Sequence, residues 1–182
     1  MDGLSQFAPR PDQAPKTPVV RHHIDHPSAW RVPDFRTSDD YSITLTPAQL
    51  ADIDGCVKAV RAAGLSLDDI ERKHFPLPTL VDTLATIGRE VADGRGFVVL
   101  RGLPTDAYSK DEIGFLYWGI GTHLGIGQSQ SVMGDRLGHV KDFSREDPNA
   151  RAYRNKQELS PHTDLSDFVS LCCLRSARTG GV

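Results

Sequence analysis

The sequence contains few cysteines, and their pattern excludes the usual cysteine-based scaffolds. There are three, Cys56, Cys172 and Cys173, in a chain of 182 residues. An odd number without a C-x-x-C pair argues against a disulfide framework and against a structural zinc site. Adjacent Cys172 and Cys173 would point to opposite faces of a strand. We interpret all three as small apolar residues of the interior, and we expect a reducing, cytoplasmic location.

Long hydrophobic runs are also absent. Apolar runs such as "FVVL" and "LCCL" are far shorter than the roughly 20 residues that a membrane-spanning helix needs. The N-terminus has no basic segment followed by an apolar core, so we expect no secretory signal. The net charge is −3, the pI is about 6.1, and the basic residues are scattered. These features argue against nucleic acid and anionic membrane surfaces as partners.

Proline is concentrated near the N-terminus, where half of the 12 prolines precede residue 34. Residues 1–45 also lack apolar periodicity, and they predict an extended arm that is ordered only where it lies on the body. Trp30 is the expected docking point, because a lone large aromatic side chain in a polar arm needs a surface to cover. The remaining residues, 46–182, have the length of one domain, and the composition is typical of a globular protein.

Three stretches predict helices. Each combines a start signal or a stop signal with apolar residues at helical spacing. In the first, Thr46 is the N-cap, Gln49 completes a capping box and Gly64 ends the helix. In the third, Ser109 and Glu112 form the capping box. The predicted helices cover 46–64, about 80–91, and a stretch that begins after Ser109.

Strand-like pieces dominate the rest of the chain. "FVVLRGL" (97–103) predicts a buried strand. Glycines from Gly119 onward break helical order, and four short pieces come after them: "SQSVMG", "RLGHVKDF", "RAYRN" and "DFVSLCCLR". Helices succeeded by short strands predict an α+β fold. Its strands would belong to a sandwich or barrel rather than to an alternating β-α-β sheet.

One candidate metal site stands out, the pair His162-x-Asp164 in "SPHTD". Residues i and i+2 of an extended segment face the same side, so the imidazole and the carboxylate would converge. Such a pair is two-thirds of the 2-His-1-carboxylate triad that binds Fe(II). The spacing alone is weak evidence, because His23-x-Asp25 in the arm matches it too. From the residues alone, a metal pair and two unrelated neighbours both stay open.

The order of several motifs along the chain bears on the choice between these two interpretations. "GRGFVVLRGLP", then "YWGIGTHLG", then "RAYRNKQELSPHTDLSDFVSLCCLRSARTGGV" resembles the TauD/TfdA-like family of Fe(II)- and 2-oxoglutarate-dependent oxygenases, over roughly residues 75–182. The resemblance implies a double-stranded β-helix (jelly-roll) core with the N-terminal helices outside it. It implies that His162 and Asp164 bind Fe(II), that 2-oxoglutarate is the co-substrate, and that the substrate is a small organic acid. Gln128, Gln130 and Tyr153 are candidates to face the substrate pocket, or structural polar residues.

Part of the family pattern is missing from the sequence. The family has a distal histidine and, beyond it, an arginine that holds 2-oxoglutarate, and the chain ends at "TGGV" before either. We do not assign His74, His123 or His139 as the third ligand, because all three lie upstream. The resemblance therefore implies the N-terminal portion of an oxygenase, a fragment with little or no activity alone. The alternative is a truncated, non-catalytic pseudoenzyme that acts by binding or self-association.

Overall fold

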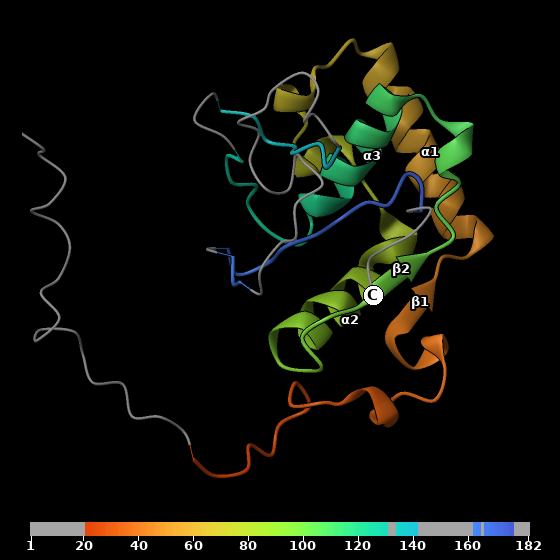
Figure 1. Cartoon of the computed structure of the whole chain (residues 1–182). Coiled ribbons are helices and arrows are strands. Elements are labelled where there is room, and N and C mark those ends of the chain that lie inside the picture. The colour runs from red at the N-terminus through yellow and green to blue at the C-terminus, as the bar shows by residue number, and fades with distance from the viewer. Residues whose placement is uncertain (1–20, 131–133, 142–161, 165, 177–182) are drawn as a thin grey trace, which may run out of the picture.

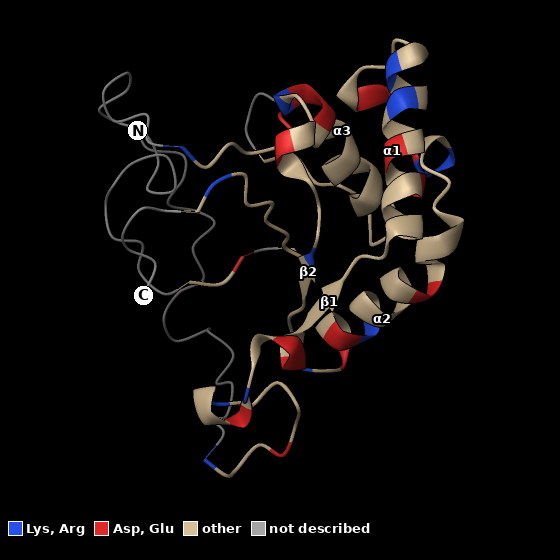
Figure 2. Ribbon diagram, turned by 90° about the vertical axis from the view of Figure 1, so that its right-hand side faces the viewer, with Lys and Arg blue, Asp and Glu red and all other residues tan. Residues whose placement is uncertain are grey.

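The computed structural model describes residues 21–130, 134–141, 162–164 and 166–176 (Figure 1). Within these residues, α1 and α3 pack against each other, and α2 lies alongside a two-stranded sheet (Figures 1 and 2). Short 3₁₀ helices connect these elements. None of the helices in this part of the chain is long and apolar enough to cross a bilayer. The helices are α1 (Pro47–Ala62), α2 (Val81–Ala92) and α3 (Lys110–Gly121), and the strands are β1 (Ser42–Thr44) and β2 (Val99–Arg101).

The start and end of α1 confirm the predicted signals. The Thr46 side chain accepts a hydrogen bond from the Gln49 backbone amide, and the Gln49 side chain accepts one from the Thr46 amide. Gly64 comes after the helix with a φ of 65°, a left-handed conformation that glycine adopts at low cost. The buried Gln49 amide group also donates to the Thr79 carbonyl and to the Thr83 hydroxyl. One polar side chain thus caps α1 and connects it to α2.

A capping box also opens α3, as predicted. Ser109 and Glu112 bond each other reciprocally, and the Glu112 carboxylate accepts a further bond from Arg61 of α1 at 2.8 Å. Acidic positions at this helix start are visible in Figure 2, where negative charge complements the helix dipole. The Ser109 backbone amide, and after it the Ser109 hydroxyl and Arg61, hold the pKa of Glu112 below its ordinary value. Both α1 and α3 therefore begin where their sequences predict.

The two strands form a parallel pair, with Ile43 opposite Leu100. Both α1 and α2 lie in the connection between these strands, so this part of the chain has the β-α-β arrangement that the sequence analysis argued against. The prediction of a buried strand at 97–103 is also wrong in part. Val99 is 37% exposed, and Leu100 is half-buried. The coarse fold class, mixed helices and strands, is confirmed.

Two predicted strands do not form in the described residues. Residues 134–141 and 166–176 contain no strand, although "RLGHVKDF" and "DFVSLCCLR" have the composition of one. A strand needs a hydrogen-bonded neighbour, and the strand-like composition of these residues cannot supply it. "RAYRN" and the middle of "SQSVMG" lie outside the described residues.

The core lies between α1, α2 and α3, and Phe75 is at its centre. This side chain is fully buried, and it comes from the connection between α1 and α2. It lies against α3 at Gly119, where an added Cβ would come within 2.4 Å of the Phe75 ring. A larger residue than glycine would therefore separate α3 from the core.

The arm docks where the sequence predicts. The Trp30 indole donates to the Arg95 carbonyl at 2.9 Å, and its ring lies 5.2 Å from that of Phe97 and 5.3 Å from that of Phe35. Tyr41 completes this aromatic cluster. The predicted extended arm is nevertheless more structured than expected, because β1 lies inside residues 1–45 and pairs with β2.

Two glycine substitutions test the close contact between α3 and Phe75. We expect Gly119→Ala to lower the free energy of unfolding by about 1–3 kcal/mol, because the new methyl group overlaps the Phe75 ring. Gly55→Ala in α1 is the matched control. Gly55 is exposed with no atom within 4 Å of an added Cβ, so alanine there should stabilise the helix by about 0.5–1 kcal/mol. Urea unfolding of both variants measures the difference; equal effects would contradict the contact.

The capping carboxylate of α3 predicts a pH dependence of stability. The pKa of Glu112 is lowered in the folded chain, so its contribution is present above the ordinary value of 4.5 and is lost as the pH falls through the lower folded value. We expect Glu112→Gln to reduce the free energy of unfolding at pH 7 and to flatten its decline below pH 4.5. Asp111→Asn, in the same helical turn, is the control. Denaturant unfolding at about pH 7 and about pH 3.5 checks this; an unchanged pH profile in Glu112→Gln would contradict it.

Candidate metal site

The two predicted ligands lie side by side. His162 Nε2 is 3.9 Å from Asp164 Oδ1, and the two side chains are 51% and 55% exposed. The intervening Thr163 is also exposed, so the three residues lie on the surface of the described part of the chain. The structure therefore brings together the imidazole and the carboxylate that the H-x-D spacing predicts.

The separation of these atoms fits one divalent cation. Metal–nitrogen and metal–oxygen bonds to protein ligands are each roughly 2.1 Å long. Two such bonds reach about 4.2 Å end to end, which exceeds the 3.9 Å between the two atoms. Adjacent octahedral positions lie about 3 Å apart, so a small rotation of either exposed side chain brings the pair into that geometry. An imidazole nitrogen and a carboxylate oxygen are also the donor types that Fe(II) takes in facial triads.

A third protein ligand is not present in the described residues. Among them, no group of three or more His, Cys, Asp or Glu side chains could hold a metal ion. His74 Nδ1 accepts a hydrogen bond from the Glu71 amide, and His123 Nε2 lies 2.7 Å from the Phe75 carbonyl oxygen. These two histidines support backbone structure, which agrees with leaving them out of the site.

The second H-x-D pair differs from the first. His23 and Asp25 are exposed, and the neighbouring His26 bonds Ser28 within the arm. His162 Nε2 and Asp164 Oδ1 lie within 4 Å of each other, whereas His23 and Asp25 in the described part of the arm make no such approach. The same spacing therefore brings the side chains together at only one of its two occurrences.

The segment after the candidate ligands is exposed at most of its large apolar side chains. Val169 is 56% exposed and Leu171 is 83% exposed. Cys172 is half-buried against the core and Cys173 is exposed, so the two cysteines differ in burial, and the prediction that both are interior residues is wrong for Cys173. Burial raises the pKa of the Cys172 thiol. This segment touches the helical core on one side and leaves apolar side chains uncovered on the other.

The candidate pocket residues are exposed where the structure describes them. The Gln128 side-chain amide donates to the Ile126 carbonyl, and that of Gln130 donates to the Gln128 carbonyl. Both therefore bond the backbone of their own loop. Tyr153 lies outside the described residues. Their assignment to a substrate pocket stays a prediction.

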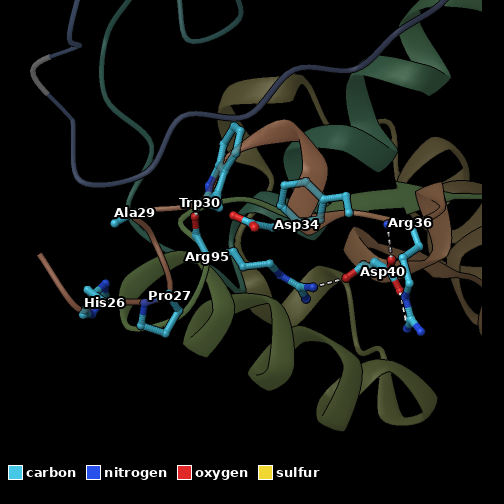
Figure 3. A pocket seen from close by; sticks show the side chains of 9 residues that line it. His26, Pro27, Ala29, Trp30, Asp34, Arg36, Asp40 and Arg95 are labelled. Carbon is cyan, nitrogen blue, oxygen red and sulfur yellow. Dashed lines mark hydrogen bonds and ion pairs between the residues drawn. The ribbon is translucent and has the colours of Figure 1, made fainter. Parts of the chain in front are cut away.

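A cavity that the sequence did not predict lies where the arm meets the body (Figure 3). It has a volume of about 450 Å³, and Trp30, Phe35 and Arg95 are among the residues that line it. Arg95 bonds the Asp40 carbonyl oxygen and pairs with Glu90 at 3.2 Å. Arg36 pairs with Asp40 at 3.5 Å. Arg36 and Asp40 thus pair within the arm, and Arg95 bonds both the arm and Glu90 of the body, so we interpret this cavity as part of the contact between arm and body.

Comparison with known proteins places the chain among oxygenases. Residues 60–182 match the model of the family described as taurine catabolism dioxygenase TauD, TfdA family. FR-33289 synthase of Streptomyces rubellomurinus is 26% identical over 166 residues, which are 90% of this chain and 49% of that protein. The taurine hydroxylase-like protein SAT17 of Stachybotrys chartarum is 28% identical over 162 residues, 84% of this chain and 42% of that protein.

Two facts about these matches matter: how much of each relative the chain covers, and how much of the chain the family model covers. The chain spans about half the length, or less, of the curated relatives it matches. The family match covers more than half of the chain and includes the segment that carries His162 and Asp164. On this evidence, the chain belongs to the TauD/TfdA family.

Proposed function

We propose that this chain contributes the histidine and the carboxylate of an Fe(II) site to a 2-oxoglutarate-dependent oxygenase that hydroxylates or oxidatively cleaves a small organic acid. The observation that carries the proposal is the approach of His162 Nε2 and Asp164 Oδ1 to 3.9 Å, inside the range that matches the family. Bound Fe(II) would supply the activation of O₂ that such a reaction needs. The two side chains would hold it from adjacent positions and leave the remaining positions open.

The proposal includes an incomplete ligand set. All 7 histidines of the sequence lie in the described residues, and no three-donor group forms there. We therefore propose that the third ligand and the arginine that binds 2-oxoglutarate belong to the half of the relatives' length that this chain does not span. The division into an arm, 1–45, and a domain portion, 46–182, and the cytoplasmic location both stay proposals.

The proposed core is a double-stranded β-helix of which this chain holds only the beginning. Two features support this. The sheet has only the strands β1 and β2 in the described residues, and the edge of a sheet presents backbone groups that can accept further strands. Large apolar side chains are also uncovered, among them Ile126 at 90%, Val140 at 70% and Leu171 at 83% exposure. Additional strands would bury them.

The exposed side chains also favour a second candidate function. Uncovered apolar surface promotes association between proteins, so a chain that keeps this surface uncovered would act by binding or self-association, without catalysis. The two candidates differ in their need for the metal pair. An oxygenase requires His162 and Asp164 to bind metal, and a non-catalytic binding protein does not.

Metal binding tests the proposal directly. We expect Co(II), used as a spectroscopic substitute for Fe(II), to broaden the NMR signals of the His162 ring before those of the other histidines. His162→Ala and Asp164→Ala should each weaken binding at least about tenfold, because one remaining ligand holds a divalent cation poorly. His23→Ala, which changes the other H-x-D pair, should leave the titration unchanged. Equal effects of His23→Ala and His162→Ala would contradict the proposal.

Activity tests whether the ligand set is incomplete. We expect the 182-residue chain with Fe(II), ascorbate and 2-oxoglutarate to form no succinate above a metal-free control, across a panel of small organic acids. The physical reason is that two ligands hold the metal weakly, and that in this proposal the arginine that orients the co-substrate lies outside the part of the relatives that the chain spans. Succinate release is measured by chromatography. Robust turnover that is abolished in His162→Ala would contradict the proposal that the ligand set is incomplete. It would leave the proposed role of His162 and Asp164 as metal ligands standing.

A further inference from the structure

A hydrogen-bonded contact joins α3 to the segment that lies after the metal pair. The Tyr117 hydroxyl lies 2.5 Å from the Ser170 carbonyl oxygen and 2.7 Å from the Ser170 hydroxyl. The phenol has one proton, and the carbonyl can only accept. Tyr117 therefore donates to the Ser170 carbonyl, and the Ser170 hydroxyl donates to Tyr117. One residue of the segment is held at two points.

Packing next to this contact fixes the orientation of the segment. Cys172, two residues after Ser170, is half-buried against the core, whereas Val169 and Leu171 are exposed. The hydrogen bonds at Ser170 and the half-buried side chain at Cys172 together oppose rotation of the segment about its own axis. The hydrogen bonds of the Tyr117 hydroxyl therefore also determine which side of the segment faces α3.

This orientation bears on the metal pair. Asp164 precedes Ser170 by six residues, and both candidate ligands are about half exposed. A metal site requires its ligands to be held close to the productive geometry, within about 0.5 Å. We infer that Tyr117 is a positioning residue for the site proposed above, and that it acts by fixing the segment 166–176 on α3. The inference rests on the proposed metal site at His162 and Asp164.

The neighbourhood of Tyr117 suits a permanent role as donor. Burial is the main cause that raises the pKa of this phenol, so the hydroxyl keeps its proton throughout the neutral range. The helix that carries it is held against the core by Gly119 and Phe75, and by Trp118, whose indole donates to the Ile70 carbonyl at 3.1 Å. Tyr117 is thus a fixed point to which the segment is attached.

Tyr108 provides a matched control. Its hydroxyl donates to the Asp54 carboxylate at 3.3 Å, so it connects the chain before α3 to α1. Burial raises the pKa of this phenol as well. Tyr108→Phe and Tyr117→Phe each remove one hydroxyl from a partly buried ring, but only the second removes a bond to segment 166–176.

The test compares these two variants in the full chain. We expect Tyr117→Phe to speed hydrogen exchange of the amides in 166–176 and to weaken Co(II) binding at His162 about three- to tenfold, the usual effect of one hydrogen bond. Ser170→Ala keeps the carbonyl acceptor and should have a smaller effect. Tyr108→Phe should leave Co(II) affinity unchanged, while its thermal midpoint falls about as much as that of Tyr117→Phe.

The outcomes separate the inference from the proposed function. If the unmodified chain binds Co(II) at His162 and Tyr117→Phe binds it equally well, the inference is overturned and the metal site stands. Faster exchange in 166–176 without a change in affinity also overturns it, since Tyr117 would then be structural alone. If the unmodified chain shows no Co(II) binding at His162, the proposed metal site fails, and the inference fails with it.

Discussion

The contact between Gly119 and Phe75 is the constraint on which the described structure depends. Phe75 is fully buried, and the absence of a side chain at Gly119 lets α3 approach its ring. Two polar contacts reinforce the approach: Trp118 donates to the Ile70 carbonyl, and the His123 ring lies within hydrogen-bond distance of the Phe75 carbonyl. The connection between α1 and α2 is thereby joined to α3, so one close packing contact fixes the relative position of the helices.

Three consecutive residues of α3 point in different directions and contact different parts of the chain. Gly119 faces the core, and Tyr117 bonds the segment 166–176. Trp118 contacts two further parts of the chain: Gly127, where an added Cβ would come within 2.0 Å of its ring, and Arg136, whose guanidinium lies 5.3 Å from the ring centroid. Successive helical residues point about 100° apart, so a single turn can hold several loops. The described segments that contain Gly127, Arg136 and Ser170 form no strand, and their contacts with Tyr117 and Trp118 attach them to α3.

The sequence predicted those elements whose stabilising partners are local. The capping boxes of Thr46 and Ser109 bond residues three positions away, so α1 and α3 can be recognised from short motifs. Strands depend on distant partners. β1 lies in the proline-rich arm and was missed, because its pairing with β2 joins Ile43 to Leu100, far along the chain. The arm's docking at Trp30 was predictable, since a large aromatic ring in a polar stretch requires a surface.

The candidate site shows where a motif stops being informative. Two H-x-D pairs with the same spacing occur in the sequence. Only in His162 and Asp164 do the imidazole and the carboxylate come within 4 Å of each other. The pairs differ in how the neighbouring residues of the chain are attached. The segment after Asp164 carries Ser170, which bonds Tyr117 of α3, and Cys172, which packs against the core. The other pair belongs to an exposed part of the arm. When a site has only two protein ligands, little binding energy is available to order the backbone that carries them. Whether such a pair binds metal is therefore decided by the contacts that order its backbone beforehand.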